Sequence, residues 1–282
     1  MNPNVTIPCS LSFQDLRRVG LTRAEIEQSI AAGAIVRARR GVYVRADASP
    51  AVPREAAAVG GRLDCVSAMR EMGVFVLERS GLHIQVARNR KHLRIPPSGR
   101  VRVGTRWEKV CVHWRDDEAQ EEHLIASPVL ALAQAVRCQT VRAAVATIDS
   151  ALHVGVIHEH DLGDLFARLP RRFRRLRRLV DGRAESGAET LARLLMRAFG
   201  RRVEVQKVID GVGRVDLVVD GWLVIECDSR EFHGGWERQE ADRLRDLKLA
   251  ALGYATIRPT ARMIFDEPEI LIRAVQGLLV TR

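Results

Sequence analysis

GRVDLVVDGWLVIECDSREFH, residues 213–233, combines two aliphatic runs with a central Asp-Gly pair. Such a pair between aliphatic runs is a strong hairpin signal, because both residues tolerate the positive φ angles of a tight turn. Side chains alternate along a strand, so Glu226 and Asp228 lie on one face, and Asp216 across the hairpin can share that face. The stretch therefore predicts that these carboxylates converge.

Two interpretations of this hairpin are open from spacing alone. Neighbouring carboxylates repel and raise one another's pKa, and a divalent cation removes the conflict. Oxygen ligands of this kind suit Mg²⁺ or Mn²⁺. Alternatively, the acidic face is simply the solvated side of an antiparallel sheet, with Asp216 and Asp228 paired to Arg214 and Arg230.

The length and composition indicate a globular protein of two or three domains: 282 residues, 46% of them hydrophobic. No apolar run is long enough to span a bilayer, and the N-terminus lacks a basic region followed by an apolar one. We therefore expect a cytoplasmic protein that does not contact membranes.

The cysteines and histidines are dispersed along the chain, and no CxxC pair is present. We therefore expect neither a disulfide framework nor a structural zinc site. The histidines of the middle region are interpreted as ordinary surface or core residues. These residues are Cys9, Cys65, Cys111, Cys138 and Cys227, and His83, His92, His113, His123, His153, His158 and His160.

The positive charge is unevenly distributed. Residues 1–183 hold 30 Lys/Arg against 19 Asp/Glu, a net charge of +11, whereas residues 184–282 hold 15 against 16, a net charge of −1. A basic body attached to a locally acidic site suits a protein that binds the backbone of a polyanion and acts on it elsewhere.

Residues 1–48 have the outline of a winged helix. Residues 10–19 predict a first helix, the capping box Thr22-Arg-Ala-Glu25 predicts a second helix to about residue 32, and two short strands follow at residues 34–45. The closing hairpin reads Arg37-Ala-Arg39-Arg40-Gly41-Val42-Tyr43-Val44. With it, this first stretch resembles the N-terminal winged-helix domain of AbiEi-type antitoxins. The resemblance implies DNA binding, although a domain that only docks on the rest of the chain stays open. The implied nucleic-acid contacts are Arg37, Arg39, Arg40, Tyr43 and Arg45.

A turn-rich stretch at residues 47–56 predicts a linker, and residues 57–160 predict a mixed α/β middle domain. Residues 161–183 predict an Arg-rich connecting helix, with one apolar stripe and many arginines over the remaining face. Nucleic acid would neutralise this face, and a solvated face is the alternative. The nucleic-acid contacts expected here are Arg171, Arg174, Arg175 and Arg178.

Residues 184–282 carry several motifs in one order: Ser186-x-x-Glu189, Arg214-x-Asp216, Glu226-Cys227-Asp228 with His233, Asp242-Arg243-x-Arg245-Asp246, and Tyr254-x-x-x-Arg258. Together they resemble the Vsr-like branch of the PD-(D/E)XK nuclease superfamily. The resemblance implies a mixed sheet flanked by helices, so that the whole chain is expected to be of the α/β (α+β) class.

The same resemblance assigns roles. It makes Glu189, Asp216 and Glu226 ligands of Mg²⁺ or Mn²⁺, and Asp228 and His233 the further catalytic groups. Arg243, Arg245 and Arg258 would support phosphate or the carboxylates. Asp228 stands where the superfamily's lysine would be, which leaves the general base unassigned; Lys207 and Lys248 are the lysines of this region.

The expected function is a metal-dependent DNA endonuclease with a winged-helix domain, in a phage-defence or toxin–antitoxin context. The alternative is a DNA-binding regulator or antitoxin with a degenerate nuclease domain. An RNA substrate also stays open, as do a protein partner and a homo-oligomer.

Overall fold

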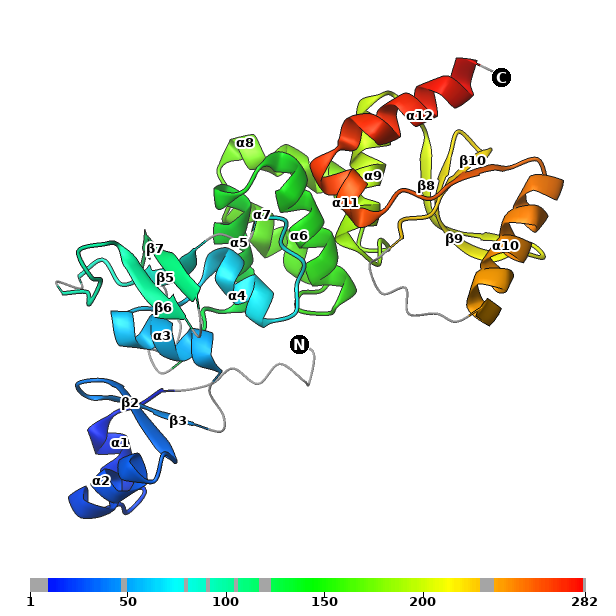
Figure 1. Cartoon of the computed structure of the whole chain (residues 1–282). Helices are drawn as coiled ribbons and strands as arrows, with labels where there is room; N and C mark the ends of the chain where they lie inside the picture. Colours follow the sequence, from blue (N-terminus) through cyan, green and yellow to red (C-terminus); the bar gives the residue numbers. More distant parts are fainter. Residues whose placement is uncertain are drawn as a thin grey trace. The chain divides into compact units, whose positions relative to one another are not determined.

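The computed structural model of the chain (Figure 1) describes residues 10–46, 50–78, 81–89, 92–103, 106–116, 123–228 and 236–280. Helices and three β-sheets alternate along it, so the expected mixed α/β class is confirmed. The chain divides into two compact units: residues 1–139 with 154–174, and residues 140–153 with 175–282. In the described residues, no helix is both long and apolar enough to cross a membrane.

The first unit begins with two helices and a small antiparallel sheet of order β1-β3-β2. Thr22 and Glu25 form the predicted capping box at the start of the second helix. The first helix begins later than predicted because Ser12 caps it, and the two residues before Ser12 pair with β3 instead. The elements are β1 (Ser10–Leu11), α1 (Phe13–Arg18), α2 (Arg23–Ala31), β2 (Ile35–Arg39) and β3 (Val42–Arg45).

The middle of the first unit is a four-stranded sheet of order β4-β5-β7-β6, in which β5 and β7 are parallel. The predicted linker at residues 47–56 is partly wrong, because α3 begins at Ala51. Pro50 and Pro53 are compatible with a first helical turn, where backbone N–H groups have no helical partner. The elements are α3 (Ala51–Val59), β4 (Arg62–Leu63), α4 (Cys65–Glu71), β5 (Leu82–Val86), β6 (Arg100–Val103), β7 (Arg106–Trp114) and α5 (Pro128–Cys138).

The predicted single Arg-rich helix at residues 161–183 is wrong. The segment forms several short helical pieces, since Pro170 cannot continue a helix that begins before it. Leu176 is buried and Phe173 half-buried, so the apolar positions pack as expected, while the surrounding arginines are exposed. The pieces are η1 (Glu159–Asp161), α7 (Leu162–Ala167), α8 (Arg171–Arg174) and η2 (Arg175–Leu179).

The second unit contains a four-stranded sheet of order β11-β10-β9-β8, with β10 and β11 parallel. Its predicted hairpin is present: Asp220 and Gly221 have φ angles of +49° and +80°, and Trp222 completes the turn. The elements are α6 (Val141–His153), α9 (Gly187–Ala198), β8 (Val203–Ile209), β9 (Gly213–Val219), β10 (Leu223–Ile225), α10 (Trp236–Ala251), β11 (Ala255–Ile257), α11 (Ala261–Asp266) and α12 (Pro268–Val280).

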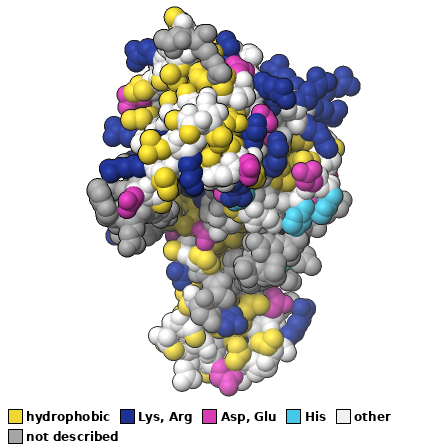
Figure 2. All heavy atoms as spheres, turned by 90° about the vertical axis from the view of Figure 1, so that its right-hand side faces the viewer, with side chains coloured by type: hydrophobic (Ala, Val, Ile, Leu, Met, Phe, Trp, Pro, Cys, Tyr) yellow, Lys and Arg dark blue, Asp and Glu magenta, His cyan; other side chains and the backbone are white. Residues whose placement is uncertain are grey.

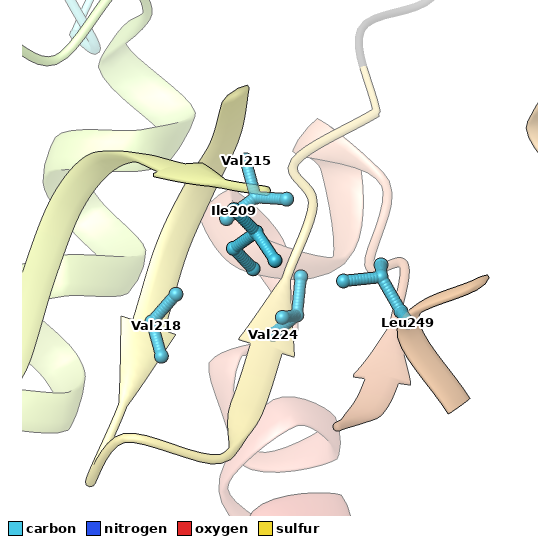
Figure 3. Close-up of a cluster of buried hydrophobic side chains, with 5 residues drawn as sticks. All are labelled: Ile209, Val215, Val218, Val224 and Leu249. Atoms are coloured by element: carbon cyan, nitrogen blue, oxygen red, sulfur yellow. The ribbon is translucent and has the colours of Figure 1, made fainter. Parts of the chain in front are cut away.

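Strand residues and α10 share a small core (Figure 3). Val218 of β9, Val224 of β10 and Leu249 of α10 are each fully buried in this cluster. Burying apolar side chains on the hairpin fixes its register, because a slip by one residue would bring its polar side chains into the core. The core therefore determines where the hairpin's carboxylates lie.

A buried ion pair joins α6 to α9 within the second unit. Nη2 of Arg193 lies 2.7 Å from Oδ2 of Asp149, and each side chain is 1% exposed. The carboxylate also accepts hydrogen bonds from the backbone N–H of Asp181 and the hydroxyl of Thr190. Burial raises the pKa of Asp149 to about 6, although Arg193 acts in the opposite direction. The carboxylate is therefore held charged at neutral pH by several donors.

We predict that Asp149→Ala lowers the free energy of unfolding of the second unit by about 3–5 kcal/mol at pH 8, because it leaves a buried guanidinium without its counter-charge. Denaturant unfolding measures the change. The control is Asp266→Ala, which removes an exposed ion pair with Arg262; it should change the same free energy by less than about 1 kcal/mol. Equal effects of the two substitutions would contradict the prediction.

Candidate functional site

Asp216 and Glu226 lie side by side where β9 and β10 meet. The strands pair Leu217 with Ile225, so Asp216 and Glu226 occupy the next position in register. The backbone N–H of Asp216 donates to Oε2 of Glu226 at 3.1 Å, and the N–H of Cys227 donates to Oδ2 of Asp216 at 2.8 Å. The hairpin thus brings the two predicted metal ligands together.

Glu189 reaches the same place from the first turn of α9. Ser186 caps this helix, and its hydroxyl accepts a hydrogen bond from the N–H of Glu189 at 3.2 Å. The Glu189 side chain is buried, and its Oε2 accepts from the N–H of Glu185 at 2.9 Å and from Nε2 of Gln206 at 2.8 Å. The helix carboxylate predicted from the cap therefore faces the sheet rather than solvent.

Gln206 connects Glu189 to Asp216 and was not predicted. Its Nε2 lies 3.5 Å from Oδ1 of Asp216 as well as 2.8 Å from Glu189. It belongs to β8 but has a φ of +52°, which is unfavourable for a residue with a Cβ. No signal in the sequence marks this glutamine, because its role depends on strand pairing and on that backbone conformation.

The electrostatics of the site are those of crowded, partly buried acids. Burial raises the pKa of Asp216, Glu189, Glu226 and Asp228. The charge of Asp216 further raises the pKa of each of the other three. The thiol of Cys227, buried among them, has its pKa raised for the same reasons. Asp216 is therefore at the electrostatic centre of the site.

Two of the three predicted arginines lie at these carboxylates. Nη2 of Arg245 is 2.9 Å from Oε1 of Glu226, and the guanidinium also bonds the backbone oxygen of Arg214. Arg258 bonds Asp246 at 2.7 Å and lies 3.9 Å from Asp228. Arg243 is exposed. The first two can neutralise part of the negative charge of the site.

The residues fit a divalent cation at one atom in particular. Oε1 of Glu226 is buried, and among the described residues no donor makes a hydrogen bond of good geometry to it, despite its ion pair with Arg245. Carboxylate oxygens of this kind are the ligands that Mg²⁺ and Mn²⁺ prefer. Asp216, Glu226 and Glu189 could hold such an ion together.

Two predictions about proton transfer have different outcomes. His233 lies outside the described residues. Lys207, one candidate for a displaced catalytic lysine, has its Nζ 3.1 Å from Glu204. Glu204 lies outside the group formed by Asp216, Glu226 and Glu189, so the ammonium is engaged elsewhere. Lys207 therefore does not join the carboxylates.

The predicted basic residues of the first 48 positions are largely at the surface. Arg37, Arg40 and Arg45 are exposed and Arg39 is half-buried. Tyr43 differs from the expectation that it contacts nucleic acid: it is 7% exposed and packs in the core of this small domain. Its ring is therefore occupied in packing, with the Arg37 guanidinium 6.0 Å from its centre.

The four arginines predicted to contact nucleic acid between residues 161 and 183 are all exposed, with Arg171 and Arg174 in the first unit and Arg175 and Arg178 in the second. Lys and Arg side chains are spread over the face shown in Figure 2, with Asp and Glu side chains between them. This exposure is compatible with phosphate binding and with solvation.

Four of the cysteines and histidines that are dispersed along the sequence lie together in the structure and could hold a metal ion. Cys65, His83, His113 and Cys138 of the first unit each offer one ligand atom, and these atoms all lie within 4.8 Å of one another. No short-range spacing could have indicated this, since the ligands are brought together by sheet pairing rather than by a local loop.

No protein-family model matches the chain, and no curated protein matches it. The chemistry of the carboxylate site is therefore inferred from its own side chains. Four acids with raised pKa values lie on strand β9, helix α9 and the segment after β10, beside two arginines.

We predict that Asp216→Asn stabilises the second unit at pH 7.5 in the presence of a chelator, by roughly 0.5–2 kcal/mol. A carboxyl whose pKa is raised by folding binds its proton more tightly in the folded state, so its unfavourable contribution appears as pH rises above the unfolded pKa. The difference from wild type should therefore disappear below about pH 4.

Thermal unfolding of both proteins across this pH range measures the difference. Mg²⁺ should raise the melting temperature of wild type and not that of Asp216→Asn. A variant that is less stable than wild type at pH 7.5 in chelator would contradict the repulsion inferred here.

Proposed function

We propose that this chain is a metal-dependent DNA endonuclease that hydrolyses phosphodiester bonds. The observation that carries the proposal is the convergence of Asp216, Glu226 and Glu189, which are buried or half-buried and are linked through Gln206 and the backbone N–H of Asp216. Such a group of acids is unfavourable by itself and becomes favourable around a divalent cation.

Asp216, Glu226 and Glu189 would hold Mg²⁺ or Mn²⁺. When bound, such an ion polarises a phosphodiester and activates water. Gln206 orients the carboxylates of Glu189 and Asp216 by donating to both. Arg245 offsets the charge of Glu226, so that a phosphate can approach an acidic site.

Proton transfer is assigned to Asp228 and His233 as groups of this chain. Asp228 is partly exposed, so its carboxyl group can exchange protons with solvent. It also lies 3.9 Å from Arg258. His233 enters this proposal from its position in the sequence motif. The sequence motif and the site do not fix which group acts as the general base: Asp228, His233 or a water molecule.

DNA is the proposed substrate because the first 183 residues carry a net charge of +11. The exposed Arg37, Arg40 and Arg45 of the small N-terminal domain, and the exposed arginines of α8 and η2, offer donors to phosphate oxygens. We place this activity in the cytoplasm, in a phage-defence or toxin–antitoxin context.

A second candidate is a DNA-binding regulator whose nuclease domain no longer cleaves. Two observations favour it. Arg245 already neutralises Glu226, so that a metal ion is not needed there. In addition, Asp228 stands at the position of the catalytic lysine in the motif, and Lys207, which could have replaced that lysine, pairs with Glu204 instead. This candidate predicts sequence-specific DNA binding that is unchanged when the carboxylates are removed.

We predict that the purified chain nicks supercoiled plasmid in Mg²⁺ or Mn²⁺, and that Asp216→Asn and Glu226→Gln each reduce the rate at least about 100-fold, because each removes a ligand charge. The matched control is Glu204→Gln, a carboxylate of the same sheet that pairs with Lys207. It should cleave at the wild-type rate.

Loss of supercoiled plasmid, followed on gels, measures these rates. Equal nicking by wild type and Asp216→Asn would exclude this site. Binding without any nicking in either metal would favour the regulator. Cleavage of a single-stranded RNA, assayed in parallel under the same conditions, decides between DNA and RNA as the substrate.

We also predict that Arg37→Ala and Arg40→Ala weaken DNA binding at low salt. Each should reduce the slope of log affinity against log salt concentration by about 1, because each loses one phosphate contact. The control is Arg18→Ala, whose exposed guanidinium already pairs with Asp15. Fluorescence anisotropy with a labelled duplex measures the slopes, and unchanged slopes for both hairpin variants would exclude the basic hairpin as a DNA contact.

A further inference from the structure

The cluster of Cys65, His83, His113 and Cys138 joins four elements of the first unit. Cys65 is the first residue of α4, His83 lies on β5, His113 on β7, and Cys138 is the last residue of α5. The parallel strands pair His83 with Cys111, so His113, two residues further on, projects from the same face as His83. Segments far apart in the sequence thus direct nitrogen and sulfur atoms to one point.

The spacing of these atoms is close to that of a tetrahedral metal site. Zn–N and Zn–S bonds of about 2.0 and 2.3 Å would place ligand nitrogens about 3.3 Å apart, and a nitrogen and a sulfur about 3.5 Å apart. Nδ1 of His83 lies 3.1 Å from Nε2 of His113, and Sγ of Cys138 lies 4.0 Å from the same Nε2. Side-chain movements of about an ångström or less would complete the geometry for these atoms.

Two further features suggest that the cluster is held in place. Cys65 has a φ of +56°, a conformation that a residue with a Cβ adopts only where its surroundings impose it. The side-chain amide of Gln134 lies 3.2 Å from Nδ1 of His113 and 3.3 Å from Sγ of Cys138. The amide N–H of Gln134 donates to Sγ of Cys138, which favours the thiolate, the form of cysteine that binds zinc.

A disulfide or a nucleophilic cysteine would account for fewer of these four residues. A disulfide would join Cys65 and Cys138, which are not disulfide-bonded in the structure and whose sulfurs are within hydrogen-bonding distance. It would not explain why the imidazoles of His83 and His113 face each other beside these sulfurs. A nucleophilic Cys138 activated by His113 would need neither the buried thiol of Cys65 nor a second histidine. Two sulfurs and two imidazole nitrogens together are the ligands that Zn²⁺ prefers over harder cations.

We propose that Cys65, His83, His113 and Cys138 form a structural zinc site that links α4, β5, β7 and α5 within the first unit. Four protein ligands close the coordination of the ion, so the site stabilises the fold rather than binding a substrate. Cys138 is exposed and provides the entry path. The proposal is independent of the carboxylate site of the second unit, which offers only oxygen ligands to Mg²⁺ or Mn²⁺.

The test is zinc analysis of the full chain, purified in reducing buffer without chelator. Inductively coupled plasma mass spectrometry should find one zinc ion per chain. Cys138→Ser and His113→Gln should each lower the zinc content at least about tenfold. The matched control is Cys111→Ser, a half-buried thiol on the same strand as His113 that is outside the ligand set; it should keep its zinc.

A second measurement uses wild type alone, in case a ligand variant does not fold. Removing zinc with a chelator should lower the melting temperature of the first unit by roughly 5–15 °C, and Zn²⁺ but not Mg²⁺ should restore it. Cobalt added to the zinc-free protein should give the intense visible absorption and thiolate charge-transfer bands of tetrahedral Co²⁺.

Several results would overturn the proposal. A zinc-free, folded protein that gives no tetrahedral cobalt spectrum would do so, as would an intact mass two hydrogens lower with a Cys65–Cys138 peptide pair. Zinc retained in both ligand variants, or lost in Cys111→Ser, would show that the ion is bound by other residues.

Discussion

Repulsion among buried carboxylates is the constraint on which the second unit depends. Burial raises the pKa of Glu189, Glu226 and Asp228, and the charge of Asp216 raises it further. None of these acids can move away, since strand pairing and helix capping hold their backbones. Shifting the hairpin by one residue would bring acidic side chains into the apolar core around Val224. The core therefore keeps together groups that would separate if they were free to do so.

The neutralising groups explain how this arrangement persists. Donors and counter-charges lie at each of three acids. The N–H of Asp216 donates to Glu226, the N–H of Cys227 donates to Asp216, and the amide of Gln206 donates to Glu189 and Asp216. The guanidinium of Arg245 pairs with Glu226. The pKa values of the acids stay raised, chiefly because the acids are buried. A site that retains this much uncompensated negative charge is typical of places where function requires it, and a divalent cation is the simplest counter-charge.

Local patterns predicted the parts of the fold that depend on neighbours in sequence. Three such patterns predicted local structure correctly, because each depends on contacts within a few residues: the Asp220-Gly221 turn, the cap at Ser186 and the capping box at Thr22. These signals located the hairpin and the helix that bring Asp216, Glu226 and Glu189 together.

Non-local features could not be predicted in the same way. The two histidines of the proposed zinc site are 30 residues apart, and only the parallel pairing of β5 with β7 brings them together. Gln206 acts through an unusual φ angle that no sequence pattern indicates. The motif predicts that Tyr43 contacts nucleic acid, whereas its side chain is buried with Leu16 and Ile26. The proposed oxygen ligands of one unit were thus found from the sequence, and the proposed sulfur and nitrogen ligands of the other unit were found from the structure.

The most direct test of the central claim is the anomalous diffraction of manganese in crystals of the chain soaked with Mn²⁺. The account predicts a manganese peak within about 2.0–2.5 Å of carboxylate oxygens from both Asp216 and Glu226. Crystals of Asp216→Asn treated in the same way should lack this peak. Wild-type crystals without manganese at these carboxylates, or with equal occupancy in the variant, would contradict the account.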